Sequence, residues 1–348
     1  WQPDTKTTLK KNPNWWDKPK GNIDEIVFTP IKSAATRSAA LISGQVDMVV
    51  DPPVQDLERI KRDPNIRVIE GPENRTIFFG FDQFRDELMG SNIKGKNPLK
   101  DNRVRQALYQ AVDMAAIEKT VMRGLGKPTG TMIAPMVNGW TKELGARASK
   151  YDVNAAKKLL ADAGYPQGFE LTLDCPNDRY VNDEAICQAV TAMWTRIGVK
   201  TNLQTAPMAQ FVSRVMNNDV SAYLFGWGVA TFDALYSLEA LMATKDGKTS
   251  AGNYNGGRFS DATLDGMIGQ IKVDQRHLGM RLPRQRQRQV DGGIGRTCAR
   301  RHRHHRQPRP AAAAHLAQYL EVLLRLSIHR HRDFSGKPDS PACSAPGW

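Results

Sequence analysis

The stretch Tyr223-Leu224-Phe225-Gly226-Trp227-Gly228 indicates how this chain folds. An apolar run ends in Gly-Trp-Gly, and the next acidic residue, Asp233, follows six positions after the Trp. Glycines on both sides of a large aromatic residue let the backbone turn at the end of a strand and present the ring to a cleft. Chemistry alone favours the alternative, a core Trp at the rim of a sheet. The pattern predicts a strand that ends beside a cleft or a core.

The residues before this stretch alternate between strand and helix patterns. Strands are predicted over 169–174, 199–204 and 220–225, with helices over 183–197 and 208–216 between them. This β-α-β-α-β order predicts a parallel sheet, because each helix returns the chain to the end at which the previous strand began. Ligands of such sheets bind beyond the carboxyl ends of the strands. Segments 175–180 and 227–233 both follow strands at that edge and are the candidate site.

The first part of the chain also alternates strand and helix patterns, which favours an α/β architecture. Ser33 is a candidate cap for a helix that ends before Gly44. Strands are predicted over 24–31, 46–50, 66–70 and 75–81, and a second helix over 53–61. Further along, Asp101 and Asp152 are candidate caps of two regular helices, and Asn182 of the long helix before Gly198.

The positive charge is concentrated near the carboxyl end. The chain has 348 residues and a formal net charge of +13. Residues 274–348 contain 15 Lys and Arg against 5 Asp and Glu and all seven His, whereas residues 1–273 contain 34 bases and 31 acids. A specific nucleic-acid interface needs basic residues and stacking aromatics on the folded part, which this balance does not supply. We therefore predict no specific nucleic-acid partner.

Several classes of chemistry are absent from the folded part. No His occurs before position 277, which excludes a Ser-His or Cys-His pair there, and no Gly-rich phosphate loop is present. The sequence predicts no enzyme, no catalytic residue, no cofactor and no metal site. The run His302, His304 and His305 is a weak metal candidate, because no capped element surrounds it. Cys175 and Cys187 leave two alternatives open, a disulfide that pins the loop between them or two buried thiols.

Six ordered segments resemble the extracytoplasmic solute-binding proteins of peptide, dipeptide and nickel ABC importers, known as family 5. The segments are Gly44–Asp47, Asp101–Asp113, Ala155–Pro166, Gly168–Leu173, Gly226–Trp227 and Tyr254–Leu264. The similarity is collinear over about residues 1–272. It implies a two-lobed α/β periplasmic-binding-protein fold, type II-like, in which the first lobe is built from both ends of the chain.

The resemblance also implies a domain organisation. Residues 1–98 correspond to part of the first lobe, 99–262 to the second lobe, and 263–273 to the start of the return to the first lobe. We expect the first lobe to be incomplete, because the chain matches no start of the family and carries no signal peptide. Residues 274–348 lose the apolar periodicity, and we expect an out-of-frame, disordered tail there. A genuine basic tail is the alternative.

The site residues follow from the same resemblance. In the dipeptide-binding branch an Arg at the position of Arg179 meets the ligand carboxylate, a role that suits the planar guanidinium. Tyr180 and Trp227 are expected to supply apolar walls. The family places an Asp three residues after the Trp to hold the ligand's amino group, but here that position is Ala230. Asp233 is the candidate substitute, and a ligand without a free amino terminus is the alternative.

The implied function is the solute-binding component of an ABC importer. It would bind a peptide-like small solute between two lobes and deliver it to a permease driven by an ATPase. The implied location is periplasmic or extracytoplasmic, and the implied state is a monomer. The alternative is a non-functional fragment whose basic tail adheres to nucleic acid non-specifically.

Overall fold

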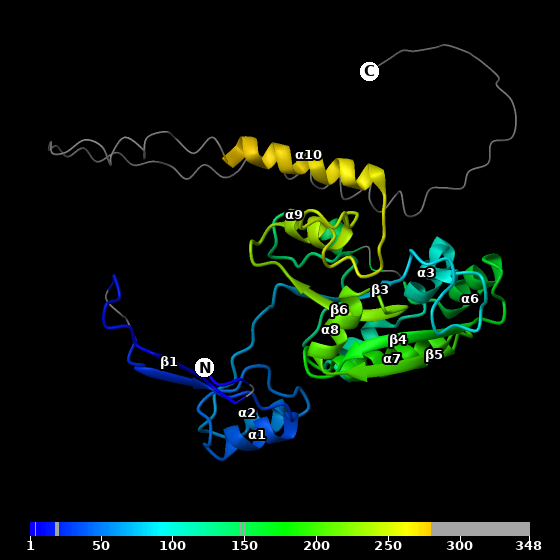
Figure 1. Ribbon diagram of the computed structural model, residues 1–348. Coiled ribbons are helices and arrows are strands. Elements are labelled where there is room, and N and C mark those ends of the chain that lie inside the picture. Colours follow the sequence, from blue (N-terminus) through cyan, green and yellow to red (C-terminus); the bar gives the residue numbers. More distant parts are fainter. Residues whose placement is uncertain (4, 18–20, 147, 149, 280–348) are drawn as a thin grey trace, which may run out of the picture.

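The computed structural model describes residues 1–279 except residues 4, 18–20, 147 and 149. Residues 280–348, which include most of the expected tail, Cys298, Cys343 and the run of histidines, lie outside the described residues. Residues 1–74 contain a two-stranded antiparallel ribbon and two short helices, drawn in blue in Figure 1. These elements are β1 (Thr7–Lys10), β2 (Glu25–Phe28), α1 (Ala34–Ile42) and α2 (Leu57–Lys61).

Residues 75–279 contain the main sheet and the helices around it. Its strands are β3 (Arg75–Phe81), β4 (Glu170–Pro176), β5 (Lys200–Ala206) and β6 (Ala222–Gly228). The α-helices are α3 (Asn102–Gln110), α4 (Met114–Ala116), α5 (Lys142–Gly145), α6 (Val153–Asp162), α7 (Asp183–Thr195), α8 (Met208–Met216), α9 (Ala234–Ser237) and α10 (Ala262–Gly279). A 3₁₀ turn, η1 (Pro98–Lys100), precedes α3, and the π-helical turns η2 (Ile117–Val121) and η3 (Leu238–Met242) continue α4 and α9.

Capping explains where several helices begin. The side chains of Ser33, Asp101 and Asp152 accept hydrogen bonds from backbone N–H groups of α1, α3 and α6, as the sequence predicted. Asn182 precedes α7 in the left-handed region with φ of 55° and makes no side-chain cap, so that part of the prediction is wrong. Instead, the neighbouring Asp183 accepts N–H groups from the loop before it.

The four strands are ordered β3-β6-β4-β5. Strands β4, β5 and β6 are parallel, which confirms the β-α-β-α-β prediction, and β3 adds to β6 in antiparallel fashion. From β4 the chain moves through α7 to β5 on one side, then through α8 back across β4 to β6. Right-handed crossovers in opposite directions place their helices on opposite faces. Figure 1 shows α7 and α8 on the two sides of the sheet.

Alternation along β6 separates two apolar cores. Ala222 and Leu224 belong to one core, with α3, α6 and α7, which we call the α7 face. Tyr223, Phe225 and Trp227 belong to the other core, with α8, α9 and α10, which we call the α8 face. Successive strand residues point to opposite faces, so one strand serves both cores.

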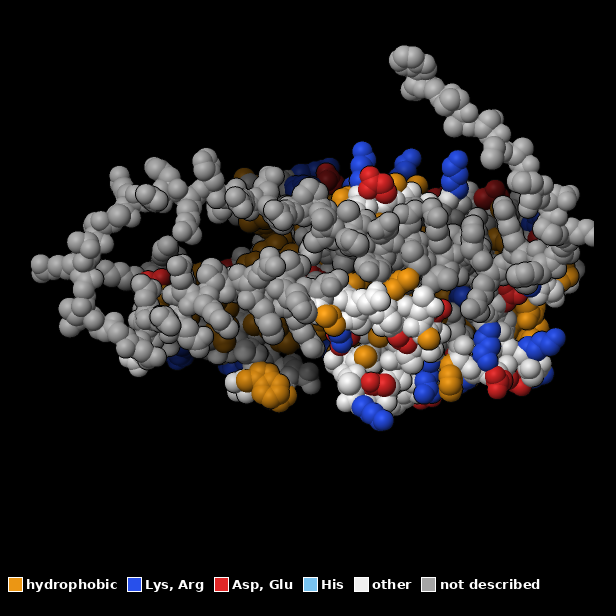
Figure 2. Space-filling model, turned by 90° about the horizontal axis from the view of Figure 1, so that it is seen from above, with side chains coloured by type: hydrophobic (Ala, Val, Ile, Leu, Met, Phe, Trp, Pro, Cys, Tyr) orange, Lys and Arg blue, Asp and Glu red, His pale blue; other side chains and the backbone are white. Residues whose placement is uncertain are grey.

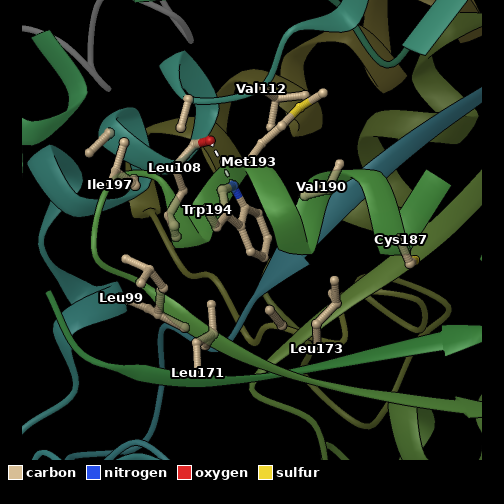
Figure 3. Packing of buried hydrophobic residues seen from close by; sticks show 14 of the residues in the cluster. Leu99, Leu108, Val112, Leu171, Leu173, Cys187, Val190, Met193, Trp194 and Ile197 are labelled. Carbon is tan, nitrogen blue, oxygen red and sulfur yellow. Dashed lines mark hydrogen bonds between the residues drawn. The ribbon is translucent and has the colours of Figure 1, made fainter. Parts of the chain in front are cut away.

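The α7 face is centred on Trp194. Its side chain is 1% exposed, and its Nε1 donates to the backbone oxygen of Leu108 at 2.9 Å. Figure 3 shows the indole between α3 and the sheet, with Leu171 and Leu173 below it. Phe79 of β3 approaches the indole edge-on at 5.6 Å between ring centroids. Helix α3, the parallel strand β4 and the antiparallel strand β3 therefore all pack on Trp194.

Other predictions differ from the structure. Residues 46–50 and 66–70 form no strand, and β6 continues through Gly-Trp-Gly to Gly228 because β3 pairs with it to that point. Strand β3 belongs to the main sheet, and the lobe boundaries that the resemblance implies, 1–98 and 99–262, stay a prediction. Helix α10 runs to Gly279, so helix continues past the expected start of the disordered tail at 274. None of the helices in the described part combines the length and apolar character required to cross a bilayer.

Candidate functional site

The candidate site lies where β4 and β6 end at the carboxyl edge of the sheet. Tyr180, in the loop after β4, donates its hydroxyl to the backbone oxygen of Gly226 at 3.2 Å. A Cβ at position 226 would lie 2.6 Å from Cε1 of that tyrosine. Glycine is needed here because the Tyr180 ring packs directly on the strand. The first of the two segments expected at this edge thus contacts β6 at Gly226, one residue before the second segment begins.

Two guanidinium groups flank the Tyr180 ring. The Cζ atom of Arg179 lies 5.2 Å from the ring centroid, and that of Arg75 lies 5.6 Å from it. Both separations are in the range of cation–π contacts. Arg179 is exposed, whereas the Arg75 side chain is 24% exposed and pairs with Glu73 at 2.7 Å. The arrangement offers an anionic group the exposed guanidinium of Arg179, while the less exposed Arg75 contacts the same ring.

The loop that carries Arg179 is held by one buried carboxylate. Asp183, which is 4% exposed, accepts the backbone N–H groups of Arg179 and Tyr180 through Oδ2, at 3.0 and 2.9 Å. Asn182 donates to the Val121 backbone oxygen and accepts from the Gln55 side chain. Burial is the largest influence on Tyr180 and raises the pKa of its phenol, so the ring stays neutral. The loop is therefore ordered by hydrogen bonds within itself and to two distant segments.

Trp227 lies on the α8 face, opposite the Tyr180 ring. Its indole stacks with Tyr236 at 5.6 Å between centroids and contacts Tyr254 at 4.9 Å. Trp227 is 9% exposed, whereas the two tyrosines are 44% and 39% exposed. The pleat of β6 thus separates the two aromatic residues that the sequence placed together. They share the end of the strand but not one face.

Asp233 is occupied by structural contacts. Its Oδ1 accepts the Leu235 N–H at 2.9 Å and caps α9, while its Oδ2 accepts from Asn138 Nδ2 at 3.0 Å. The backbones of Asn138 and Asp233 also form an isolated parallel bridge. Ala230 is exposed in the same loop. The carboxylate shapes this loop, and the position three residues after the Trp presents only a methyl group.

Cys175 and Cys187 form a disulfide, which decides between the two alternatives that the sequence left open. Both residues are fully buried on the α7 face.

Within the residues that the structure describes, no three His, Cys, Asp or Glu side chains are grouped so as to hold a metal ion. Basic and acidic side chains are interspersed on the face seen in Figure 2.

A buried ion pair lies behind the site on the α8 face. Asp174 of β4 contacts Arg214 of α8 at 2.5 Å, and only 3% of the aspartate side chain is exposed. Burial raises the pKa of Asp174 to about 6, against the opposing effect of Arg214. The pair ties α8 to the centre of the sheet. No local pattern in the sequence distinguishes this Asp from a surface residue of a strand.

Sequence reasoning missed Arg75, Tyr236 and Tyr254 as neighbours of the candidate residues. Arg75 begins a strand that was predicted correctly, but its partner strand was not known, so its side chain had no assigned surroundings. Tyr236 and Tyr254 are separated from Trp227 by loops whose course no periodicity indicates. The one signal in the sequence that points to Tyr236 is its position shortly after Gly-Trp-Gly.

A sequence model of the "Bacterial extracellular solute-binding proteins, family 5 Middle" matches residues 1–249. The chain belongs to this family. Among curated family 5 relatives, heme-binding protein A of Haemophilus influenzae is 30% identical over 261 residues, which cover 73% of this chain and 44% of the relative. The dipeptide-binding protein of Escherichia coli is 28% identical over 230 residues, covering 65% and 40%. The chain spans about half the length of the curated relatives it matches.

Solved structures agree on the fold of this family 5 chain. The periplasmic binding protein DppA from Helicobacter pylori, in complex with the peptide STSA, superposes with a TM-score of 0.69 at 20% identity, over 93% of this chain and 53% of that one. HbpA2 from Haemophilus parasuis gives a TM-score of 0.56 at 27% identity, over 78% and 50%. The α/β periplasmic-binding-protein fold is thereby confirmed. The family consists of extracellular solute-binding proteins rather than enzymes.

Proposed function

We propose that this chain is part of a solute-binding component of an ABC importer and binds a peptide-like small solute at the carboxyl edge of the main sheet. The observation that supports this proposal is the exposed guanidinium of Arg179 against the Tyr180 ring, which Arg75 also contacts. An arginine fork binds a carboxylate through two parallel hydrogen bonds. Arg179 is the proposed carboxylate receptor of the solute.

The walls of the proposed site come from both faces of the sheet. A solute lying across the end of β6 would meet Tyr180 on the α7 face and Trp227, with its exposed tyrosine neighbours, on the α8 face. Aromatic surfaces suit apolar groups of a solute without fixing their identity. Asp233 is proposed to shape the loop beside the solute, because both its oxygens already accept N–H groups.

The proposed solute has a carboxylate and no requirement for a free amino terminus. Ala230 offers no charge to an ammonium group, and an unpaired buried ammonium would cost roughly 2–5 kcal/mol. Among described acidic residues beside the site, Glu73 is paired with Arg75, and Asp183 accepts backbone N–H groups. An N-blocked or otherwise uncharged end therefore fits this edge better than an ammonium.

The wider role follows from membership of family 5. We assign residues 1–74 to the first lobe and 75–262 to the second, because β3 belongs to the main sheet. The proposed partners are a permease and, through it, an ATPase, and the proposed location is extracytoplasmic, with the chain acting as a monomer. Nothing in the relatives named above favours the nucleic-acid alternative.

The test is calorimetric titration with dileucine, N-acetyl-dileucine and dileucine amide. We expect N-acetylation to leave the affinity unchanged and amidation to weaken it. Arg179→Ala should weaken binding of N-acetyl-dileucine about tenfold to a hundredfold, as expected for the loss of about 1.5–3 kcal/mol from a charged hydrogen bond. Arg196→Ala, an exposed arginine at the other end of α7, is the matched control. Equal affinity of wild type and Arg179→Ala for this probe would refute the proposed role.

A further inference from the structure

A covalent ring encloses the loop that presents Arg179. Cys175 is the next-to-last residue of β4, and Cys187 lies in the second turn of α7, twelve residues later. Their disulfide joins the end of the strand to the helix and encloses everything between them. Both cysteines are fully buried on the α7 face, so the link is part of the core and not a surface clip.

Inside this ring, hydrogen bonds reach three different elements. Asp178 accepts the Met208 N–H at 2.7 Å at the start of α8, and Tyr180 donates to β6. Asp183 accepts the N–H groups of Arg179 and Tyr180. The first of these contacts is exposed, and exposed hydrogen bonds exchange readily with water. The two bonds of Asp183 depend on the position of α7, because this residue begins the helix.

The disulfide sets that separation. Asp183 is the first residue of α7, and Cys187 follows it by one turn, so the position of the buried carboxylate depends on where the helix begins relative to β4. With Cα atoms held 6.7 Å apart across the bridge, the carboxylate of Asp183 stays within reach of the two N–H groups. Cutting the link would let the start of α7 move away from the loop.

We propose that the Cys175–Cys187 disulfide is a positioning device that holds Arg179 and Tyr180 in the conformation that receives the solute. Ring closure removes alternative conformations of the loop before binding, and preorganisation of this kind favours affinity. The consequence for solute binding rests on the proposed function. The order of the loop does not depend on the proposed function, so loop order and solute binding can be tested separately.

The loop carries its own reporter, because trypsin cleaves after arginine. In the oxidised protein the Arg179–Tyr180 bond is protected, since Asp183 binds the flanking N–H groups and Tyr180 is 9% exposed. The double variant Cys175→Ala, Cys187→Ala should be cut at this bond at least tenfold faster than wild type. Cleavage after Lys248, in an exposed loop far along the chain, is the internal reference and should not change.

Two controls separate loop order from general stability. Ile268→Ala opens a cavity on the α8 face and lowers stability without touching the loop, so its cleavage after Arg179 should stay at the wild-type rate. Because both cysteines are fully buried, the wild type is reduced with a phosphine in denaturant and refolded under reducing conditions, and this protein should reproduce the double variant. Unchanged cleavage after Arg179 in the double variant, or an equal rise at Lys248 and in Ile268→Ala, would overturn the proposal.

Affinity measurements then test whether the ordered loop favours solute binding. At a temperature where all variants are folded, the double variant should bind N-acetyl-dileucine about tenfold more weakly than wild type, and Ile268→Ala should bind it as wild type does. Faster cleavage after Arg179 with unchanged affinity would overturn the link to binding. Wild type that binds no probe at all refutes the proposed function instead, and the cleavage result still decides the order of the loop.

Discussion

Residues 1–74 and residues 75–273 follow the same alternation of strand and helix patterns but reach different degrees of burial. Among the residues whose burial the structure describes, twelve of the twenty-two exposed large apolar side chains lie in the first 74 residues, although this is the shorter region. Among the described residues of this region, Ala40, Pro53, Val54, Leu57 and Ile60 are the buried apolar side chains, against two extensive cores in the second region. All four residues of β2 are exposed, including Ile26, Val27 and Phe28.

The difference shows that a strand or helix with an apolar pattern forms a buried core only when a second layer of secondary structure covers its apolar face. The main sheet has four strands and helices on both faces, and its two central strands, β4 and β6, are almost entirely covered. Strands β1 and β2 pair only with each other, and a two-stranded ribbon is at best marginally stable alone. We therefore expect cooperative stability to come from residues 75–273.

Replacing one Trp in each region by Ala should give the largest difference in stability between the two regions. Trp194→Ala removes the centre of the α7 face and leaves the Leu108 carbonyl without its donor, and it should lower the free energy of unfolding by about 3–5 kcal/mol. Trp16→Ala, 83% exposed in the first region, should change it by less than about 0.5 kcal/mol. Urea unfolding followed by circular dichroism measures both. Similar losses would mean that the two regions share one core.

The dependence of stability on pH should also come from the second region. Because the folded-state pKa of Asp174 is about 6, above its ordinary value, its protonated form favours folding. This contribution is complete below about pH 4 and is lost as pH rises through 6, and its size is about 1–3 kcal/mol. Asp174→Asn should flatten the slope in urea titrations between pH 4.5 and 7.5. Glu25→Gln, in an exposed ion pair with Lys10, is the control and should leave the slope as it is.

Replacing one helix-capping residue in each region should give a smaller difference in stability. Asp152 Oδ1 accepts the Ala155 N–H at 2.9 Å, and Asp152→Ala should lower the free energy of unfolding by about 1 kcal/mol. Ser33 makes the equivalent bond to Thr36 at 3.3 Å, but in the first region. Ser33→Ala should leave the main thermal transition in place, because α1 is not packed on the main sheet. A shift as large as that of Asp152→Ala would break the comparison.

The smallest effect is expected on the ribbon itself. Phe28→Ser removes an aromatic side chain that is 57% exposed, so the free energy of unfolding should change by less than about 0.5 kcal/mol. Because less apolar surface then meets water, binding of a hydrophobic fluorescent dye should fall. A large loss of stability would show instead that Phe28 is covered in solution.

Local patterns predicted most of the second region. The bounds of β3 and α8 agree with their predictions, and β4 and α7 agree within two residues at either end. Such elements depend on hydrogen bonds and apolar spacing within a few residues, which a sequence displays directly. The strands expected over 46–50 and 66–70 do not form, because a strand also needs a partner that the pattern cannot supply.

The strands that carry the candidate residues were predicted, but the contacts of those residues were not. The loop after β4 meets the end of β6, where Tyr180 packs on Gly226. The roles of Arg179, Tyr180, Trp227 and Asp233 in binding stay predictions. Neither the neighbouring Arg75 nor the hydrogen bonds that occupy Asp233 have a local signature, because their partners come from distant segments.

The sequence by itself determined the family, the α/β class, the order of strands and helices in the second region, and the edge at which a solute is expected. All of these rest on short-range spacing and on segments that match the family in order. The tertiary structure alone decided the antiparallel addition of β3, the pairing of Cys175 with Cys187, and the placement of Tyr180 and Trp227 on opposite faces. These depend on packing between residues far apart in the chain, which exists only once the sheet has formed.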